Sequence, residues 1–317
     1  MLGKNGIVIF GKIGLGIKKY PKISIVTPSF NSVKYIEMTI NSIIDQAYPN
    51  LEYIIIDGGS NDGTKDIIEK YDDKITFWHS SPDKGQSDAI NQGFKKSTGD
   101  IITFCNSDDI YLPGTFNYIA EKWNYWKKFG AIIGSFQYMN EKSEIIKKTR
   151  PPRILKNGPT DLSLGPPGNY RLHQVSTFFS SIALDKVGRY VKEDFHYVLD
   201  RELLFRVLKE FPIYLVERTF GVFRVHAVSK STEKIIPFYK EFHDLYMSML
   251  NGDKEEDSKR KYMAKYYLYR GNVKKAKSEN KLYIKTLLLI KSFFILPGKI
   301  LETYHIKLWL KILIKNS

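Results

Sequence analysis

Short runs of β-branched and aromatic residues alternate with segments of helical periodicity in the first part of the chain. The runs cover residues 23–27, 51–56, 74–79 and 100–105. Between them, the segments 31–47, 64–72 and 86–97 carry apolar residues three or four positions apart, which is typical of amphipathic helices. Strands that alternate with helices form parallel βαβ units. We therefore expect an α/β domain with a mostly parallel central sheet.

The pattern changes after residue 105. Helical spacing at 115–128 and 198–210 is accompanied by strand-like runs at 130–138, 174–180, 213–217 and 220–225. A proline-rich connection fills 150–170, and beyond 232 the spacing is helical to the end. These changes predict three parts: a basic extension over 1–20, an α/β domain over 21–232 and a basic α-helical region over 233–317.

The chain carries a formal net charge of +15, and the excess is concentrated at its ends. Residues 23–232 are nearly neutral, whereas 1–22 and 233–317 are strongly basic. A neutral middle argues against a nucleic-acid groove, so we expect no nucleic-acid partner. Basic ends favour contact with an anionic membrane surface, although they also occur where they only aid solubility. The single cysteine, Cys105, excludes an internal disulfide and is compatible with a reducing cytoplasm.

Polar residues cluster directly after the predicted strands. Asp57 follows the second strand, Asp88 opens a predicted helix, and Asp108 and Asp109 follow the fourth strand. Because open α/β sheets bind ligands at the carboxyl ends of their strands, we expect these acids near one edge of the sheet. Carboxylates gathered there repel one another unless a cation is present, and their hard oxygens suit Mg²⁺ or Mn²⁺. Taken alone, each acid is better explained as a helix cap or a turn residue.

Six stretches of the chain together resemble a known family. In order they are "PKISIVTPSFN", "YPNLEYIIIDGGSNDGT", "DKGQSDAINQGF", "STGDIITFCNSDDIYLPG", "HQVSTFF" and "LDRELLFRV". Their order and spacing resemble the family 2 glycosyltransferases over roughly 21–226. The resemblance implies the GT-A fold and a metal-dependent, hexosyltransferase-like reaction. In it a sugar moves with inversion from a nucleotide-diphosphate donor, with UDP-sugar the expected donor, to a hydroxyl of a glycan or lipid-linked glycan. A role in envelope or extracellular polysaccharide synthesis would follow.

The resemblance also implies roles for residues that bind the nucleotide. Thr27, Ser29 and Asp57 match positions that hold the base and ribose, and Asp88 and Asn91 match the helix start that closes over them. Family members often have a second Asp directly after the position of Asp57, where it contacts the base. This chain has glycine there, which leaves the choice of nucleotide open.

The stretch Asn106-Ser107-Asp108 falls on the D-x-D motif of the family, with Asn106 in place of the first acid. The resemblance gives Asn106 and Ser107 to the nucleotide sugar and Asp108 to a divalent metal, Mg²⁺ or Mn²⁺, with Asp109 as a second candidate ligand. A divalent ion would neutralise the charge that develops on the departing diphosphate. With one acid missing, we expect modest metal affinity.

Asp200 in "LDRELL" matches the general base of the family. An acceptor hydroxyl is a poor nucleophile, so a positioned carboxylate is chemically suitable. From the sequence alone, Asp200 fits a helix N-cap equally well. His173 and Gln174 open "HQVSTFF", where we expect them to line the acceptor side.

Two other classes of function fit parts of the sequence. A sugar-phosphate nucleotidyltransferase would need a glycine-rich, basic loop after the first strand, but residues 27–31 contain no glycine and no arginine. A non-catalytic glycan- or nucleotide-binding module would need neither Asp108 nor Asp200. Both alternatives are therefore disfavoured.

The C-terminal residues 280–317 contain seven lysines and one glutamate, interleaved with apolar residues. Pro297-Gly298 divides them into two pieces, each too short to span a bilayer. Helices with cationic and apolar faces lie in the membrane interface. We expect a cytoplasmic protein that is peripheral on the inner face of the cell membrane. The alternative is that both pieces pack on the rest of the protein as covering helices.

Overall fold

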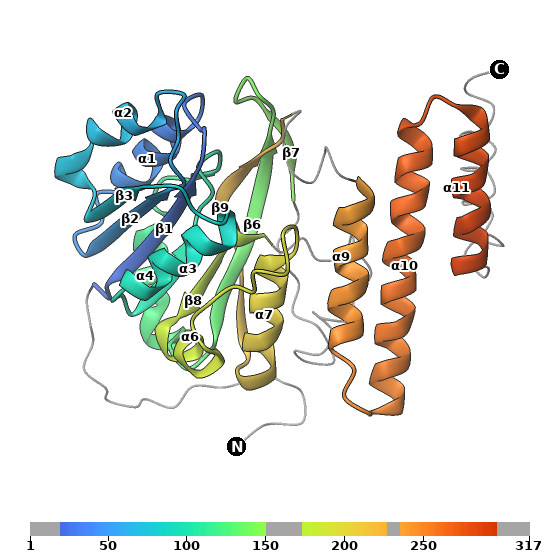
Figure 1. Ribbon diagram of the computed structural model, residues 1–317. Coiled ribbons are helices and arrows are strands. Elements are labelled where there is room, and N and C mark those ends of the chain that lie inside the picture. The colour runs from blue at the N-terminus through green and yellow to red at the C-terminus, as the bar shows by residue number, and fades with distance from the viewer. Residues whose placement is uncertain (1–19, 150–172, 227–234, 297–317) are drawn as a thin grey trace. The chain divides into compact units, whose positions relative to one another are not determined.

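The computed structural model describes residues 20–149, 173–226 and 235–296 (Figure 1). The chain divides into two compact units, and each is described by itself. Unit 1 comprises residues up to Asp194 together with Leu199–Val225. Unit 2 comprises Phe195–Val198 and the residues from His226 onward. The expected extension over 1–20, except Tyr20, and the lysines beyond residue 296 lie outside the described residues.

One half of the sheet in unit 1 is parallel. Its strands lie in the order β3 (Phe77–Ser80), β2 (Leu51–Asp57), β1 (Ile23–Ser29) and β4 (Ile101–Phe104). All neighbours in this half pair in parallel, with Ser29 opposite Asp57 at the carboxyl ends of β1 and β2. The expected α/β class with parallel βαβ units is therefore confirmed.

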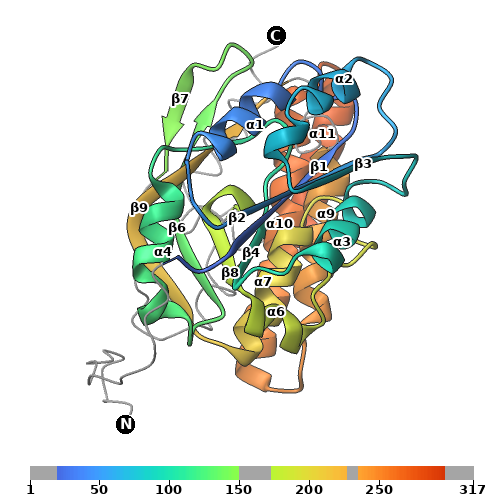
Figure 2. The same cartoon turned by 90° about the vertical axis from the view of Figure 1, so that its left-hand side faces the viewer.

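The other half of the sheet is mixed. It contains β5 (Ile110–Tyr111), β6 (Ala131–Met139), β7 (Ile145–Lys148), β8 (Thr177–Ser180) and β9 (Ile213–Arg224). Strand β8 is antiparallel to both β4 and β6, whereas β6 and β9 are parallel and lie side by side next to α4 (Figure 2). The two strands predicted at 213–217 and 220–225 form the single strand β9. Shifts in its register with β6 absorb the polar residues between them.

Helices cover both faces of this sheet. They are α1 (Ile36–Ile44), α2 (Thr64–Glu69), α3 (Gln86–Lys96), α4 (Thr115–Trp126), α6 (Ser181–Val187) and α7 (Leu199–Glu210), with short 3-10 turns η1 (Asp72–Lys74) and η2 (Gln174–Ser176). Ile23 and Ile25 of β1 belong to one buried cluster with residues of α1 and α4. Val26 points to the other face, where a Cβ at Gly93 of α3 would lie 2.2 Å from its Cγ1. Strand alternation thus supplies both core faces, and glycine permits the close approach of α3.

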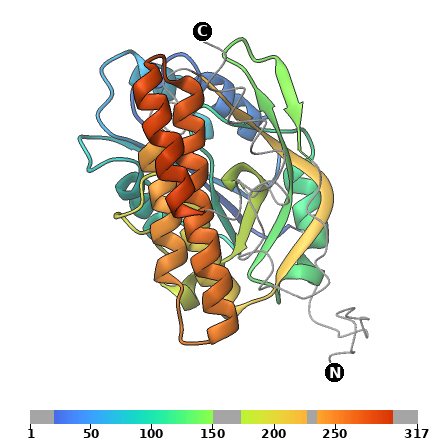
Figure 3. The same ribbon diagram turned by 90° about the vertical axis from the view of Figure 1, so that its right-hand side faces the viewer.

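Unit 2 contains three helices in the part that the structure describes: α9 (Ile235–Ser248), α10 (Lys254–Ser278) and α11 (Leu282–Ile295). Helix α10 contacts both others and lies alongside α11 (Figure 3). Its Tyr267 stacks on Phe242 of α9 at 4.3 Å. Asp253 caps α10 by accepting from the amide of Glu256 at 2.8 Å. The expected helical C-terminal region is confirmed, and no described helix is long and apolar enough to cross a membrane.

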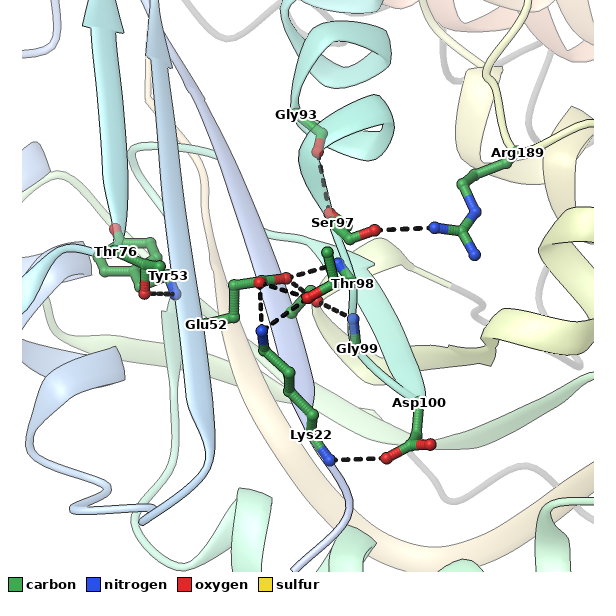
Figure 4. A network of polar contacts seen from close by, with 11 residues as sticks. Lys22, Glu52, Tyr53, Thr76, Gly93, Ser97, Thr98, Gly99, Asp100 and Arg189 are labelled. Carbon is green, nitrogen blue, oxygen red and sulfur yellow. Dashed lines mark hydrogen bonds and ion pairs between the residues drawn. The ribbon is translucent and has the colours of Figure 1, made fainter.

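A buried glutamate ties together the amino-terminal ends of β1, β2 and β4 (Figure 4). Glu52 accepts hydrogen bonds from the Ser24 hydroxyl at 2.6 Å and from the backbone and hydroxyl of Thr98, both at 2.7 Å. Lys22 Nζ lies 2.5 Å from Glu52 Oε1, which also accepts from the Thr98 hydroxyl. Burial alone would raise the pKa of Glu52, but these partners outweigh burial and lower it to about 2.

We predict that Glu52→Gln lowers the free energy of unfolding at pH 7 by about 2 kcal/mol, because it removes a charged acceptor from buried donors. The stabilising effect of the ionised carboxylate is fully present above pH 4.5, the ordinary pKa of glutamate. It is lost as pH falls toward about 2, the pKa of Glu52 in the folded protein. The deficit of the variant should therefore shrink in acid. Urea unfolding between pH 7 and 3 measures it, with Glu69→Gln, whose exposed ion pair with Lys65 spans 3.6 Å, as control. A deficit that is absent, or equal at every pH, contradicts this role.

Candidate donor-binding and catalytic site

The loops that follow β1, β2 and β4 lie at one edge of the sheet, as the parallel register requires. Thr27 is buried in β1, and its Oγ1 accepts a hydrogen bond from the Tyr53 hydroxyl at 3.2 Å. Ser29 ends the strand with 4% of its surface exposed, and its hydroxyl has no hydrogen-bond partner within the described residues. A buried hydroxyl without a partner is costly unless a ligand or water satisfies it.

Asp57 shapes the loop after β2. Its fully buried carboxylate accepts from the amide of Ser60 at 2.9 Å, the hydroxyl of Ser60 at 2.5 Å and the hydroxyl of Ser80 at 2.7 Å. These donors hold residues 57–60 against the end of β3. The structure therefore places Asp57 at the expected edge of the sheet. Its side chain is buried under the loop and holds it in place.

The start of α3 carries two predicted site residues with different surroundings. Asp88, in the first turn, accepts from the amide of Lys84 at 3.1 Å and remains partly exposed. Asn91, one turn further on, exchanges two hydrogen bonds with the backbone of Val191, at 2.8 and 3.0 Å. Because both ends of its amide are engaged there, Asn91 braces a distant loop, and we do not include it in the donor site.

The turn after β4 is tied to two neighbouring loops. Gln86 Nε2 donates to Asn106 Oδ1 at 2.7 Å, and the hydroxyl of Ser107 lies 2.7 Å from that of Ser32. The turn therefore joins the start of α3 to the loop after β1. Asp108 follows these two hydrogen-bonded residues and precedes the buried Asp109, and it is partly exposed. The turn that carries Asp108 thus lies between the loop after β1 and the start of α3.

Asp109 is fully buried and connects three segments. It accepts from Gln174 Nε2 at 2.5 Å, from the backbone amide of Arg224 at 3.0 Å and from Asn106 Nδ2 at 3.4 Å. Burial and the neighbouring Asp108 charge raise the pKa of Asp109 well above its ordinary value. Both carboxylate oxygens of Asp109 already accept hydrogen bonds from buried donors. The expected role of Asp109 as an additional metal ligand is therefore not supported.

Arg224 is a buried residue that the sequence did not single out. Its guanidinium donates to the backbone carbonyls of Asp108 at 3.1 Å and Asn140 at 3.1 Å, and lies 4.5 Å from the ring centre of Tyr35. Burial lowers its pKa. Arg224 therefore fixes the backbone of the Asp108 turn from below. In the sequence, only its position near the end of the strand predicted at 220–225 indicated that Arg224 could reach this edge of the sheet.

Asp200 lies in the first turn of α7, as expected. It lines a small pocket with His173, Gln174, Thr177, Phe179, Arg201 and Leu204. Burial raises the pKa of Asp200, against the opposing effect of Arg201 and of backbone hydrogen bonds that include the amide of Gln174. A carboxylate with a raised pKa holds a proton more readily, which suits a general base. His173 and Gln174, which we expect to line the acceptor side, lie in this pocket with Asp200.

Glu202 is unsuited to the same role. Its buried carboxylate accepts from Arg206 Nε at 2.9 and 3.0 Å and lies 3.3 Å from Lys192 Nζ. Arg206 in turn donates to the Val187 carbonyl at 2.7 Å. Glu202 therefore holds the end of α6 against α7, and Asp200 is the candidate base.

The residues present fit a metal ion only together with a substrate. Among the described residues, no group of three or more His, Cys, Asp or Glu side chains could hold a metal. Asn106 Oδ1 already accepts from Gln86, which leaves Asp108 as the carboxylate at this turn that could bind an ion. Mg²⁺ commonly binds through one or two carboxylates, waters and substrate phosphates, and this arrangement matches that pattern.

Comparisons with known proteins identify the family and the fold of this chain. The family model described as Glycosyl transferase family 2 matches residues 24–188. An uncharacterized glycosyltransferase of Rickettsia prowazekii is 26% identical over 231 residues, covering 73% of this chain and 72% of that protein. The family match includes the ends of β1, β2 and β4 and the start of α3.

Solved structures share the fold at low sequence identity. Staphylococcus aureus TarS 1–349, in complex with UDP-GlcNAc, has a TM-score of 0.60 and 16% identity, covering 92% of this chain and 90% of that chain. The mannosyltransferase PcManGT from Pyrobaculum calidifontis, in complex with GDP-Man and Mn²⁺, has a TM-score of 0.57 and 17% identity, covering 94% and 88%. The GT-A-type fold is therefore confirmed.

We predict that Asp109→Ala lowers the free energy of unfolding by about 3 kcal/mol, because it strands the buried donors of Gln174, Asn106 and Arg224. Asp88→Ala, at a partly exposed carboxylate, should change it by less than about 1 kcal/mol. Denaturant unfolding followed by tryptophan fluorescence compares the two variants. Equal stability of Asp109→Ala and wild type would show that the carboxyl is not a structural connector.

Proposed function

This chain belongs to glycosyl transferase family 2, and from that premise we propose that it transfers a sugar with inversion from a UDP-sugar to a hydroxyl group of a glycan acceptor. The observation that carries the proposal is the edge where β1, β2 and β4 end. There Ser29 ends β1 with a buried hydroxyl that has no partner among the described residues, and the partly exposed Asp108 follows the neighbouring parallel strand β4. The complexes of TarS with UDP-GlcNAc and of PcManGT with GDP-Man, proteins of the same fold, support a nucleotide-sugar donor.

Two carboxylates divide the chemistry. Asp108 serves the diphosphate side, where a divalent cation, once bound, neutralises the leaving group. Asp200 serves the acceptor side, where its carboxylate removes the proton from the attacking hydroxyl. Because burial raises the pKa of Asp200, the base is ionised only above that raised pKa and loses activity as pH falls through it. Backbone hydrogen bonds from Arg201 and Gln174 orient the carboxylate for this task.

Asp108 would hold the cation, Mg²⁺ or Mn²⁺, together with oxygens of the donor diphosphate and water. Asn106 contributes by fixing the turn through Gln86. The Mn²⁺ of the PcManGT complex supports a divalent cation in this fold.

We further propose that the protein works at the cytoplasmic face of the cell membrane, on a lipid-linked or envelope glycan. Helix α11 carries exposed apolar side chains, among them Phe294 with 77%, Tyr283 with 64% and Leu287 with 61% of their surfaces exposed. Lys281, at the start of this helix, and Lys291 are also exposed, whereas Lys285 is buried. An apolar face beside lysines fits an anionic lipid surface.

We predict that Asp108→Ala abolishes sugar transfer and weakens UDP binding in Mn²⁺, because the one carboxylate on the diphosphate side is lost. Mn²⁺ alone should not raise the melting temperature of the wild type, whereas UDP with Mn²⁺ should. At 100 times Kd a ligand stabilises by about 2.7 kcal/mol, which a thermal-shift assay resolves easily. Full transfer activity in excess EDTA, or unchanged activity of Asp108→Ala, contradicts this assignment.

A second prediction concerns the membrane. Wild-type protein should co-sediment with anionic vesicles at low salt and detach as salt rises, since each lysine near the surface contributes about 1 kcal/mol. The double variant Leu287→Glu with Phe294→Glu should stay in the supernatant. The control Ile182→Glu, at an apolar residue that is 61% exposed on α6, should bind like wild type.

Two outcomes contradict the membrane assignment. In the first, wild type remains soluble at low salt or the double variant binds equally well. In the second, wild type does not bind vesicles but forms a dimer that the double variant dissociates, which would assign the apolar face to a second copy of the chain.

A further inference from the structure

The chain leaves unit 1 briefly just before the candidate base. The segment Phe195–Val198 belongs to unit 2, and the chain re-enters unit 1 at Leu199, the first residue of α7. Asp200 is the next residue, so a single residue lies between the candidate base and a segment that is part of the helical unit. Whatever holds Phe195–Val198 in place therefore also determines where the first turn of α7 begins.

Glu241 of α9 holds this segment through its backbone. Its Oε1 accepts from the amide of His196 at 2.9 Å, and its Oε2 accepts from the amides of His196 at 3.0 Å and Tyr197 at 2.7 Å. Hydrogen bonds to an ionised carboxylate are about twice as strong as those between neutral groups. The Glu241 carboxylate thus fixes two successive peptide groups directly before α7.

An aromatic ring on α9 packs against the same segment. Phe238, three residues before Glu241 and therefore on the same face of the helix, meets the ring of Tyr197 edge to face, with ring centres 6.1 Å apart. Phe238 also contacts Phe242 at 5.2 Å, and Phe242 stacks on Tyr267 of α10. Glu241 is therefore carried by a helix that is itself supported by α10.

The other end of the loop between α6 and α7 is fixed separately. Val191 exchanges two backbone hydrogen bonds with the Asn91 side chain, at 2.8 and 3.0 Å. Val198 and Leu199, which follow the segment held by Glu241, are buried. Buried side chains leave this short link little freedom. Of the two anchors of the loop, the one made by Glu241 lies nearer to the base along the chain.

We propose that Glu241 is a positioning residue for sugar transfer: by holding the amides of His196 and Tyr197 it fixes the start of α7 and aims the Asp200 carboxylate at the acceptor. This inference rests on the proposed role of Asp200 as the base. A base works only within hydrogen-bond reach of the proton it removes, and a misplacement of about 1 Å can cost about 10² in rate. The helical unit thus contributes to the reaction through the base.

Glu241→Ala removes all three hydrogen bonds to the segment. With a panel of UDP-sugars that includes UDP-GlcNAc, in Mn²⁺ and with water as the acceptor, kcat for UDP release should fall about tenfold or more. The dissociation constant for UDP, measured by calorimetry, should stay close to that of wild type, because donor binding does not depend on the base. Glu241→Gln keeps one oxygen, which can serve both amides as Oε2 does, and should retain most of the rate.

The same helix supplies a matched control. Asp244 makes an exposed ion pair with Lys240 at 2.9 Å and also bonds to His243. Asp244→Ala therefore removes a carboxylate from α9 without touching the segment before α7. Its kcat should equal that of wild type.

A double-mutant cycle separates positioning from general support of the fold. In an Asp200→Asn background, Glu241→Ala should slow UDP release by less than about twofold, because no base remains to be placed. Equal slowing in both backgrounds, or a wild-type kcat for Glu241→Ala, assigns Glu241 to structure alone and overturns the inference. Melting temperatures identify a variant that fails to fold. Should Glu241→Ala fail, Glu241→Asp, whose shorter side chain withdraws the carboxylate from the amides, takes its place in the cycle.

Failure of this inference is distinguishable from failure of the proposed function. If Asp200→Asn slows the reaction but Glu241→Ala does not, the base stands and only the positioning role of Glu241 is overturned. If Asp200→Asn turns over normally, the proposed base and the role of Glu241 are both wrong. A wild type that releases UDP from no member of the panel overturns the proposed donor and this inference together.

Discussion

The buried carboxyl group of Asp109 lies where three segments of unit 1 meet. Its donors come from the turn after β4, from η2 and from the end of β9, and the last is 115 residues away in sequence. Moving any segment independently would leave a buried polar group unsatisfied, which is costly in a low-dielectric interior. Gln174 also lines the pocket that contains Asp200. Asp109 therefore keeps the Asp108 turn and the candidate base in a fixed relation.

The two ends of the parallel strands are built for different tasks. At the amino-terminal end, the Glu52 carboxylate accepts hydrogen bonds from Ser24 and Thr98 and pairs with Lys22, so both of its oxygens have partners (Figure 4). At the carboxyl end, polar atoms such as the Ser29 hydroxyl are buried without a partner in the described chain. Satisfied polar groups at one end stabilise the sheet, and unsatisfied ones at the other are available to a ligand.

The positions of most candidate residues followed from the sequence, because residues after buried strands must gather at one edge of a parallel sheet. Their individual roles did not follow. The pairing of Asn91 with Val191 and the burial of Arg224 depend on contacts between distant segments, which periodicity does not encode. Adjacent Asp108 and Asp109 look equivalent in sequence, yet only the fold decides which one is enclosed by donors. Lys285 likewise follows the helical pattern of a surface residue but is buried.

The central claim is that Asp200, which shares a pocket with Gln174, removes the proton from the acceptor, and Asp200→Asn tests it most directly. The amide keeps the shape of the carboxylate but cannot take a proton. Single-turnover transfer should slow by about 10² or more while the dissociation constant for the donor stays close to that of wild type. In wild type, kcat/KM should fall in acid with a pKa above the ordinary aspartate value of 3.8. Normal turnover by Asp200→Asn would contradict the account.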